Sequence, residues 1–204
     1  MLNLREMLDI FTGRAPVESF ANRRIDIAAG IASFAAAFFL VAFLFTIEFG
    51  AFKAITGFMA AESLVNLFVA IAIIVFLAVV LSLVSFLAII IFLYVWGAIH
   101  FFIAKFFSNK PQSLNDFNGA WFGLFGSVVL VEGLVALVPI LGWVIAIAIK
   151  LYGVVLSFRF VKSRFNLSDA QAAIVVLLPF DLAMLGLVII SGIASFILIS
   201  PKIL

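Results

Sequence analysis

Residues 63–107 read SLVNLFVAIAIIVFLAVVLSLVSFLAIIIFLYVWGAIHFFIAKFF, and this stretch decides the fold class. Its only formal charge is Lys105, close to its end. An apolar run of roughly 18 residues or more is long enough to cross the ~30 Å hydrocarbon core of a bilayer as a helix. The stretch is therefore a membrane-spanning sequence, and it is too long for a single upright span.

The composition of the whole chain agrees with this interpretation. Of its 204 residues, 67% are hydrophobic and only 11% are charged. Soluble domains are about half apolar and about a quarter charged. A water-soluble fold could not cover so much apolar surface with so few charges. We therefore predict an all-α, polytopic integral membrane protein whose main surroundings are the lipid bilayer.

Several function classes are excluded or disfavoured by what the sequence lacks. The absence of cysteine excludes a disulfide framework, a thiolate metal site and a cysteine nucleophile. The single histidine, His100, leaves little for zinc binding or for acid–base chemistry. No Gly-rich phosphate loop, His–Glu metal motif or serine elbow is present, and no basic stripe with interleaved aromatic residues indicates nucleic-acid binding. We expect no enzyme, no cofactor, no metal site and no nucleic-acid partner.

The chain divides into an N-terminal cytoplasmic or interfacial segment, residues 1–26, and a transmembrane domain, residues 27–204. The predicted spans of this domain are about 27–49, 64–107, 119–138, 143–162 and 170–199. The second is one long tilted or kinked helix, two spans, or an in-plane helix that runs into a span. Basic residues help to decide between one crossing and two.

Arg23, Arg24, Arg159, Lys162 and Arg164 are predicted to anchor the topology at the headgroups. A third basic cluster is formed by Lys105 and Lys110. The three clusters share one side of the membrane only if residues 64–107 cross once. The positive-inside bias favours this arrangement. We therefore predict five crossings, with the N-terminus cytoplasmic and the C-terminus outside.

A short interfacial helix is predicted before the first span. Met1, Leu4, Leu8 and Phe11 recur at helical spacing, and Gly13 can end the helix. A frayed polar tail is the alternative.

Three ionisable residues lie inside predicted spans: Glu132, Lys150 and Asp181. Pro139 and Gly142 predict a tight turn, and Glu132 and Lys150 each lie nine residues from Leu141 in that turn. At 1.5 Å per residue both are about 13 Å from the turn, so the two side chains can form a buried ion pair.

Asp181 lies at a similar depth, roughly 15 Å into the last span. Pro179 cannot donate to the carbonyl of Val175, which leaves an acceptor just below Asp181. The three ionisable groups predict either a polar contact that fixes neighbouring helices or an ion or proton pathway; a lipid or partner contact is the third option.

Two further features can be interpreted as ordinary structural elements or as functional ones. His100 is expected to form interfacial hydrogen bonds, and a pH-sensing role is the specific alternative. Gly119 and Gly123 match the GxxxG spacing, which predicts a helix-packing or dimer face.

The stretch GAIHFFIAKFF, residues 97–107, resembles a motif of the Yip family, the Ypt/Rab-interacting membrane proteins. In that motif an apolar span runs into a histidine and then a lysine, here His100 and Lys105. The similarity continues through SLNDF to the run IKLYGVVL…LSDAQAA…LP, which ends at Pro179. The resemblance implies a five-span fold.

The long cytosolic N-terminal region of eukaryotic Yip proteins is missing, as is the family's Gly-Gly pair, where Ser108 to Pro111 stand instead. Binding of a Rab-type GTPase is therefore not expected, and a prokaryotic cell-membrane member is. We predict a membrane-organising or partner-binding protein, with self-association or other membrane proteins as partners. The alternative is a small ion or proton channel or transporter that uses Asp181, Glu132 and Lys150.

Overall fold

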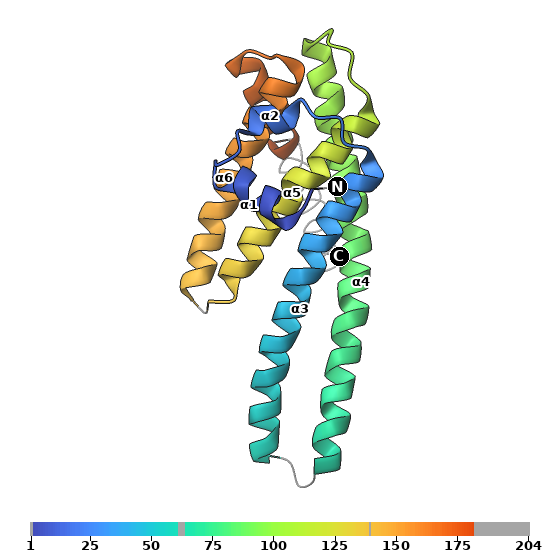
Figure 1. Cartoon of the computed structure of the whole chain (residues 1–204), viewed down its shortest axis with the longest axis vertical. Coiled ribbons are helices and arrows are strands. Elements are labelled where there is room, and N and C mark those ends of the chain that lie inside the picture. Colours follow the sequence, from blue (N-terminus) through green and yellow to red (C-terminus); the bar gives the residue numbers. More distant parts are fainter. Residues whose placement is uncertain (1, 61–63, 139, 182–204) are drawn as a thin grey trace, which may run out of the picture.

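A computed structural model describes residues 2–60, 64–138 and 140–181 of the chain (Figure 1). In these ranges the regular structure is helical throughout. The helices are α1 (Leu4–Phe11), α2 (Val17–Ala21), α3 (Ile27–Ala60), α4 (Leu64–Phe107), α5 (Leu114–Ala136) and α6 (Leu141–Phe165). Residues 169–181 are also helical.

Four of the helices are long and apolar enough to cross a membrane: Ile27–Glu48 of α3, Ile71–Phe107 of α4, Leu114–Ala136 of α5 and Val144–Phe165 of α6. The chain is therefore an integral membrane protein with a helical-bundle fold, as its composition predicts. The fifth predicted span, 170–199, begins as a helix but lies outside the described residues from 182 onward.

The long apolar stretch is one continuous helix, so the alternative of two spans is wrong. Helix α4 has 44 residues and runs beside α3, which has 34 (Figure 1). The pair extends well past the tip of the α5–α6 hairpin (Figure 1). Because α4 does not turn back, Lys105 lies at the same end of the molecule as Arg24 and Arg164, and the three line one pocket.

Helix α5 begins five residues before the predicted boundary. Its N-cap is Ser113, whose side chain accepts a hydrogen bond from the amide of Asp116 at 3.0 Å. The polar residues that follow the cap belong to the first turn, and Asn118 among them is fully buried. The turn between α5 and α6 places Ile140 at a φ of 62°, and the predicted turn residue Pro139 lies outside the described residues.

Glycines let α3 and α5 approach backbone to backbone. A Cβ atom on Gly30 would lie 2.6 Å from the Cα of Gly119, and one on Gly119 would overlap the carbonyl of Ile25. On the next turn, Gly123 faces Leu2 and Phe20. The predicted GxxxG face is therefore used inside the chain, for packing of α3 and the N-terminal segment.

Helix α1 is present, so the frayed-tail alternative is wrong, but its packed face differs from the predicted one. Asn3 and Glu6 form a reciprocal capping box, with bonds of 2.8 and 3.1 Å. Met7 and Ile10 are buried, whereas Leu4 and Leu8 are each 38% exposed. The cause is the docking of α1 on α5, where the Met7 side chain approaches Gly126.

Helix α2 is fixed to the far end of α6 by an arginine. Arg164, in the last turn of α6, is buried and donates from Nη1 to the backbone carbonyls of Ala21, at 2.5 Å, and Arg23, at 2.6 Å. Phe20 of α2 packs against Phe160 of α6 beside this contact. The N-terminal segment is thus a folded part of the bundle.

Candidate functional site

The predicted ion pair between Glu132 and Lys150 is formed. Nζ of Lys150 lies 3.1 Å from Oε1 of Glu132, so the two positions share one level of the α5–α6 hairpin. The prediction that the pair is buried is wrong. The Lys150 side chain is 68% exposed and that of Glu132 26% exposed.

A cavity of about 300 Å³ opens beside this pair, between α4, α5, α6 and the helical residues 169–181. Most of its wall is apolar or aromatic, including Phe125 and Phe180. Its polar lining side chains are His100, Trp121, Glu132, Lys150 and Ser157. An apolar pocket with a few converging polar groups is the usual form of a ligand site.

His100 lies deep in this pocket, enclosed by other side chains of the bundle. It is 1% exposed, because its ring packs against that of Trp121 with centroids 4.8 Å apart. Nδ1 lies 2.8 Å from the carbonyl of Trp96. A carbonyl only accepts, so this contact is a hydrogen bond when the proton of the ring is on Nδ1.

Polar atoms next to His100 lack partners among the described residues. They are Nε2 of His100, Nε1 of Trp121 and both amide atoms of Asn118. The Asn118 side chain lies over Gly97 of α4, where a Cβ atom would overlap its Oδ1. Each unpartnered buried group costs about 1–3 kcal/mol. Their grouping therefore lowers the stability of the fold, and it marks this part of the α4–α5 interface as a candidate polar site.

Asp181 does not join the pair in the part of the chain that the structure describes. Its side chain is exposed at the end of the helical residues 169–181, and no described ion pair links it to Lys150. Pro179 is buried within the same helical segment. The segment starts at a reciprocal cap, in which Ser168 and Gln171 bond to each other at 3.0 and 3.4 Å.

The predicted headgroup anchors have different surroundings. Arg23 pairs with Glu6 at 3.3 Å, and Lys162 pairs with Asp169. Arg159 is exposed on α6. Arg164, in contrast, is 2% exposed and holds the backbone near α2. Its role as a structural link was missed, because the sequence offers no signal that connects it to Ala21.

Trp121 and Asn118 were also missed as pocket and polar-cluster residues. The predicted span, 119–138, begins one residue after Asn118. The spacing of three between them puts both on one face of α5, but only the structure shows that this face meets Gly97 and His100 of α4.

Comparison of the chain with protein-family models, with curated proteins and with solved structures finds no match. The resemblance to the Yip family therefore stays a prediction.

Proposed function

We propose that this integral membrane protein organises the bilayer around it, and that the α3–α4 hairpin is the part that does so. The observation that carries the proposal is the length of apolar helix in α4. Its apolar part, Ile71–Phe107, has 37 residues and is about 55 Å long at 1.5 Å per residue. A bilayer core is ~30 Å thick.

Tilt alone does not absorb this difference. Membrane helices tilt by up to about 40°, and at that angle a 55 Å helix still spans about 42 Å. A surplus of about 12 Å remains, which requires local thickening of the bilayer or bending of the helix. Thickening or bending around a fixed hairpin changes the shape of the membrane near the protein, and this is the proposed activity.

The same hairpin offers a surface for a membrane partner. A groove of about 660 Å³ runs between α3 and α4, with Phe39 and Phe43 on one side and Val79 and Leu83 on the other. Ala42, Thr46, Ala78 and Ser82 also line it. Small and hydroxyl-bearing residues allow close helix packing in lipid. Partner binding or self-association through this groove is the second part of the proposal.

Reconstitution into phosphatidylcholine vesicles of graded acyl length, from 14 to 22 carbons, tests the thickness effect. Local bilayer thickness around the protein is measured by cryo-electron microscopy, and helix tilt by polarised infrared spectroscopy. We expect thickening and tilt to be largest in the thinnest bilayers.

A matched variant lacks residues 42–48 and 75–81, two turns from each helix, which removes about 10 Å of apolar length. This is close to the surplus, so the variant should lose most of the thickening while it retains the α5–α6 hairpin. Equal bilayer thickness around both proteins would disprove the proposal.

A second candidate function is ion or proton movement, favoured by the pocket that holds Glu132, Lys150 and His100. Proton and monovalent-cation flux is measured in proteoliposomes for the wild type, Lys150→Ala and Asp181→Asn. Loss of flux in the folded variants supports transport. Flux no higher than in empty liposomes would leave the ion pair as a contact between neighbouring helices.

The remaining parts of the proposal follow from the distribution of basic residues, from the missing catalytic motifs and from the resemblance to the Yip family. They are five crossings, a cytoplasmic N-terminus, a prokaryotic cell membrane, no catalytic activity and no Rab-type GTPase partner. Cysteine scanning tests the topology, because the chain has no cysteine of its own. Labelling near Asn109 and Ser163 from the cytoplasmic side is expected; labelling of both from outside would reverse the orientation.

A further inference from the structure

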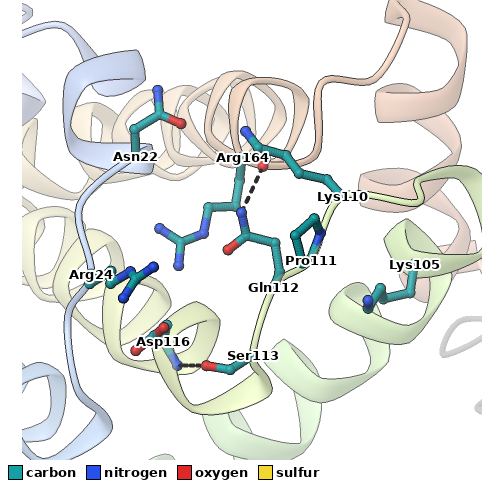
Figure 2. Close-up of a pocket in the computed structure, with 9 residues that line it drawn as sticks. All are labelled: Asn22, Arg24, Lys105, Lys110, Pro111, Gln112, Ser113, Asp116 and Arg164. Atoms are coloured by element: carbon teal, nitrogen blue, oxygen red, sulfur yellow. Dashed lines mark hydrogen bonds between the residues drawn. The ribbon is translucent and has the colours of Figure 1, made fainter.

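A second cavity, of about 620 Å³, lies at the end of the bundle where α4 and α6 finish and α5 starts (Figure 2). Four cationic side chains line it: Arg24, Lys105, Lys110 and Arg164. One carboxylate, Asp116, lines it as well. Four positive charges against one negative charge leave the basic pocket with a net charge of +3.

The cations of this pocket differ from most others in the described part of the chain. Arg5, Arg23, Lys150 and Lys162 each have a carboxylate within 4 Å. In the described ranges no such ion pair is formed by the four cations of the basic pocket. Three of them come from separate segments far apart in sequence, so their gathering is a product of the fold. Uncompensated cations held together cost free energy unless an anion binds them.

Arg164 gives the pocket a buried cationic group in a fixed position. The residue is 2% exposed, and its Nη1 is fixed by the carbonyls of Ala21 and Arg23. Its Nε has no partner among the described residues. The guanidinium extends into the space beside Arg24 and Asp116 (Figure 2). The backbone of Arg164 is held in turn by Gln112, whose side-chain nitrogen lies 3.4 Å from its carbonyl oxygen.

The start of α5 adds to the positive potential. Ser113 and the first turn of this 23-residue helix border the pocket. The dipole of the helix favours an anion at this end.

From these observations we infer that the basic pocket binds a phosphate group. Arginine and lysine converging on a helix N-terminus is the usual chemistry of phosphate recognition. The phosphate belongs either to the headgroup of an anionic lipid or to a soluble phosphate compound. The pocket lies at the end of two apolar helices, and Phe106, next to Lys105, is 86% exposed. A lipid could place its acyl chains along that surface with its phosphate in the pocket.

Native mass spectrometry of the full chain, released from nanodiscs, tests the lipid source. The nanodiscs contain either phosphatidylglycerol with phosphatidylcholine or phosphatidylcholine alone. Calorimetric titration of the detergent-solubilised protein with inorganic phosphate and glycerol phosphate tests the soluble source.

The test variant is the double change Lys105→Gln and Lys110→Gln, which spares the structural contacts of Arg164. A basic residue near an anionic surface contributes about fivefold to binding, so the double variant should bind about 25-fold more weakly. The matched control is Arg159→Gln, which removes an exposed charge of α6 outside the pocket. Circular dichroism checks that the variants fold.

Retention of phosphatidylglycerol over phosphatidylcholine, lost in the double variant and kept in the control, supports a lipid headgroup. Binding of soluble phosphate alone, with the same dependence on the variants, supports a phosphate site filled from solution. No preference for phosphate-bearing anions, or equal loss in the Arg159→Gln control, overturns the inference. None of these variants changes the hairpin length, so the result is independent of the proposed bilayer effect.

Discussion

Replacing Gly119 by alanine is expected to weaken the contact between α3 and α5. The new methyl group would overlap the carbonyl oxygen of Ile25, with the backbone of Asp26 only 2.7 Å away. These are backbone atoms, so no side-chain rotation relieves the clash and the helices must separate by roughly 1 Å. Overpacking costs about 1–3 kcal/mol, and the upper end applies here. Alanine regains about 1 kcal/mol of helix propensity, so the net loss is about 2 kcal/mol.

Gly153→Ala is the matched control for this change. Its methyl group would meet the Val128 side chain at 3.4 Å, an ordinary contact. This variant should therefore keep only the gain in helix propensity, about 1 kcal/mol. The two alanine variants should differ by about 3 kcal/mol in free energy of unfolding.

Titration with SDS in mixed micelles measures this free energy, with the fluorescence of the three tryptophans as the signal. Gly30→Ala is expected to resemble Gly119→Ala, and the double variant to be less destabilised than the sum, because both changes open one contact. Equal stabilities of Gly119→Ala and Gly153→Ala would refute the close backbone approach of α3 and α5.

Three other outcomes are expected. The hydrogen bond from the Asn3 amide lowers the pKa of Glu6. The docking of α1 is therefore supported above the ordinary pKa of 4.5 and weakens as the pH falls through the lower pKa of the folded state. Hydrogen exchange of α1 from pH 6 to pH 3 measures this effect, and Glu6→Gln should remove the pH dependence. Removal of Lys150 alone should destabilise the protein more in lipid nanodiscs than in detergent. In chemical unfolding, the double variant Glu132→Gln, Lys150→Gln should recover part of this loss; no recovery would mean that the pair contributes nothing in lipid. Arg164→Ala should cost about 2 kcal/mol and expose the segment around α2 to trypsin, whereas an unchanged cleavage pattern would contradict its linking role.

The hairpin geometry could be predicted because it depends on local regularity. The positions of Glu132 and Lys150 follow from counting residues away from one turn, at a constant rise per residue. Their exposure could not be predicted in this way. It depends on how α4 and the last helix pack around the hairpin, and this packing is set by contacts between distant segments.

The N-terminal helix shows a second limit. Leu4, Leu8 and Phe11 fit helical spacing, but so do Met7 and Ile10, and periodicity alone cannot choose between two apolar faces. The surface of α5 makes the choice, because Gly126 leaves room for Met7.

The basic pocket was not predicted, although each of its residues can be read in the sequence. The sequence predicts Arg24 and Arg164 as separate topology anchors and Lys105 as part of another basic cluster, since each lies at the end of a span. The structure places the three at one end of the bundle, as a single crossing of residues 64–107 requires. Their convergence on a single cavity additionally requires α4 and α6 to end at the same level, and this depends on tertiary packing.

The link between Arg164 and Ala21 also constrains the order in which the protein can be assembled. The two residues are 143 positions apart in the chain. At a synthesis rate of about 5–20 residues per second, Arg164 is synthesised about 7–30 s after the carbonyls near α2. During this time the N-terminal segment cannot adopt its final position, and α3 and α4 have already been synthesised. We therefore expect the long hairpin to enter the membrane first and the N-terminal segment to dock last, when α6 is complete.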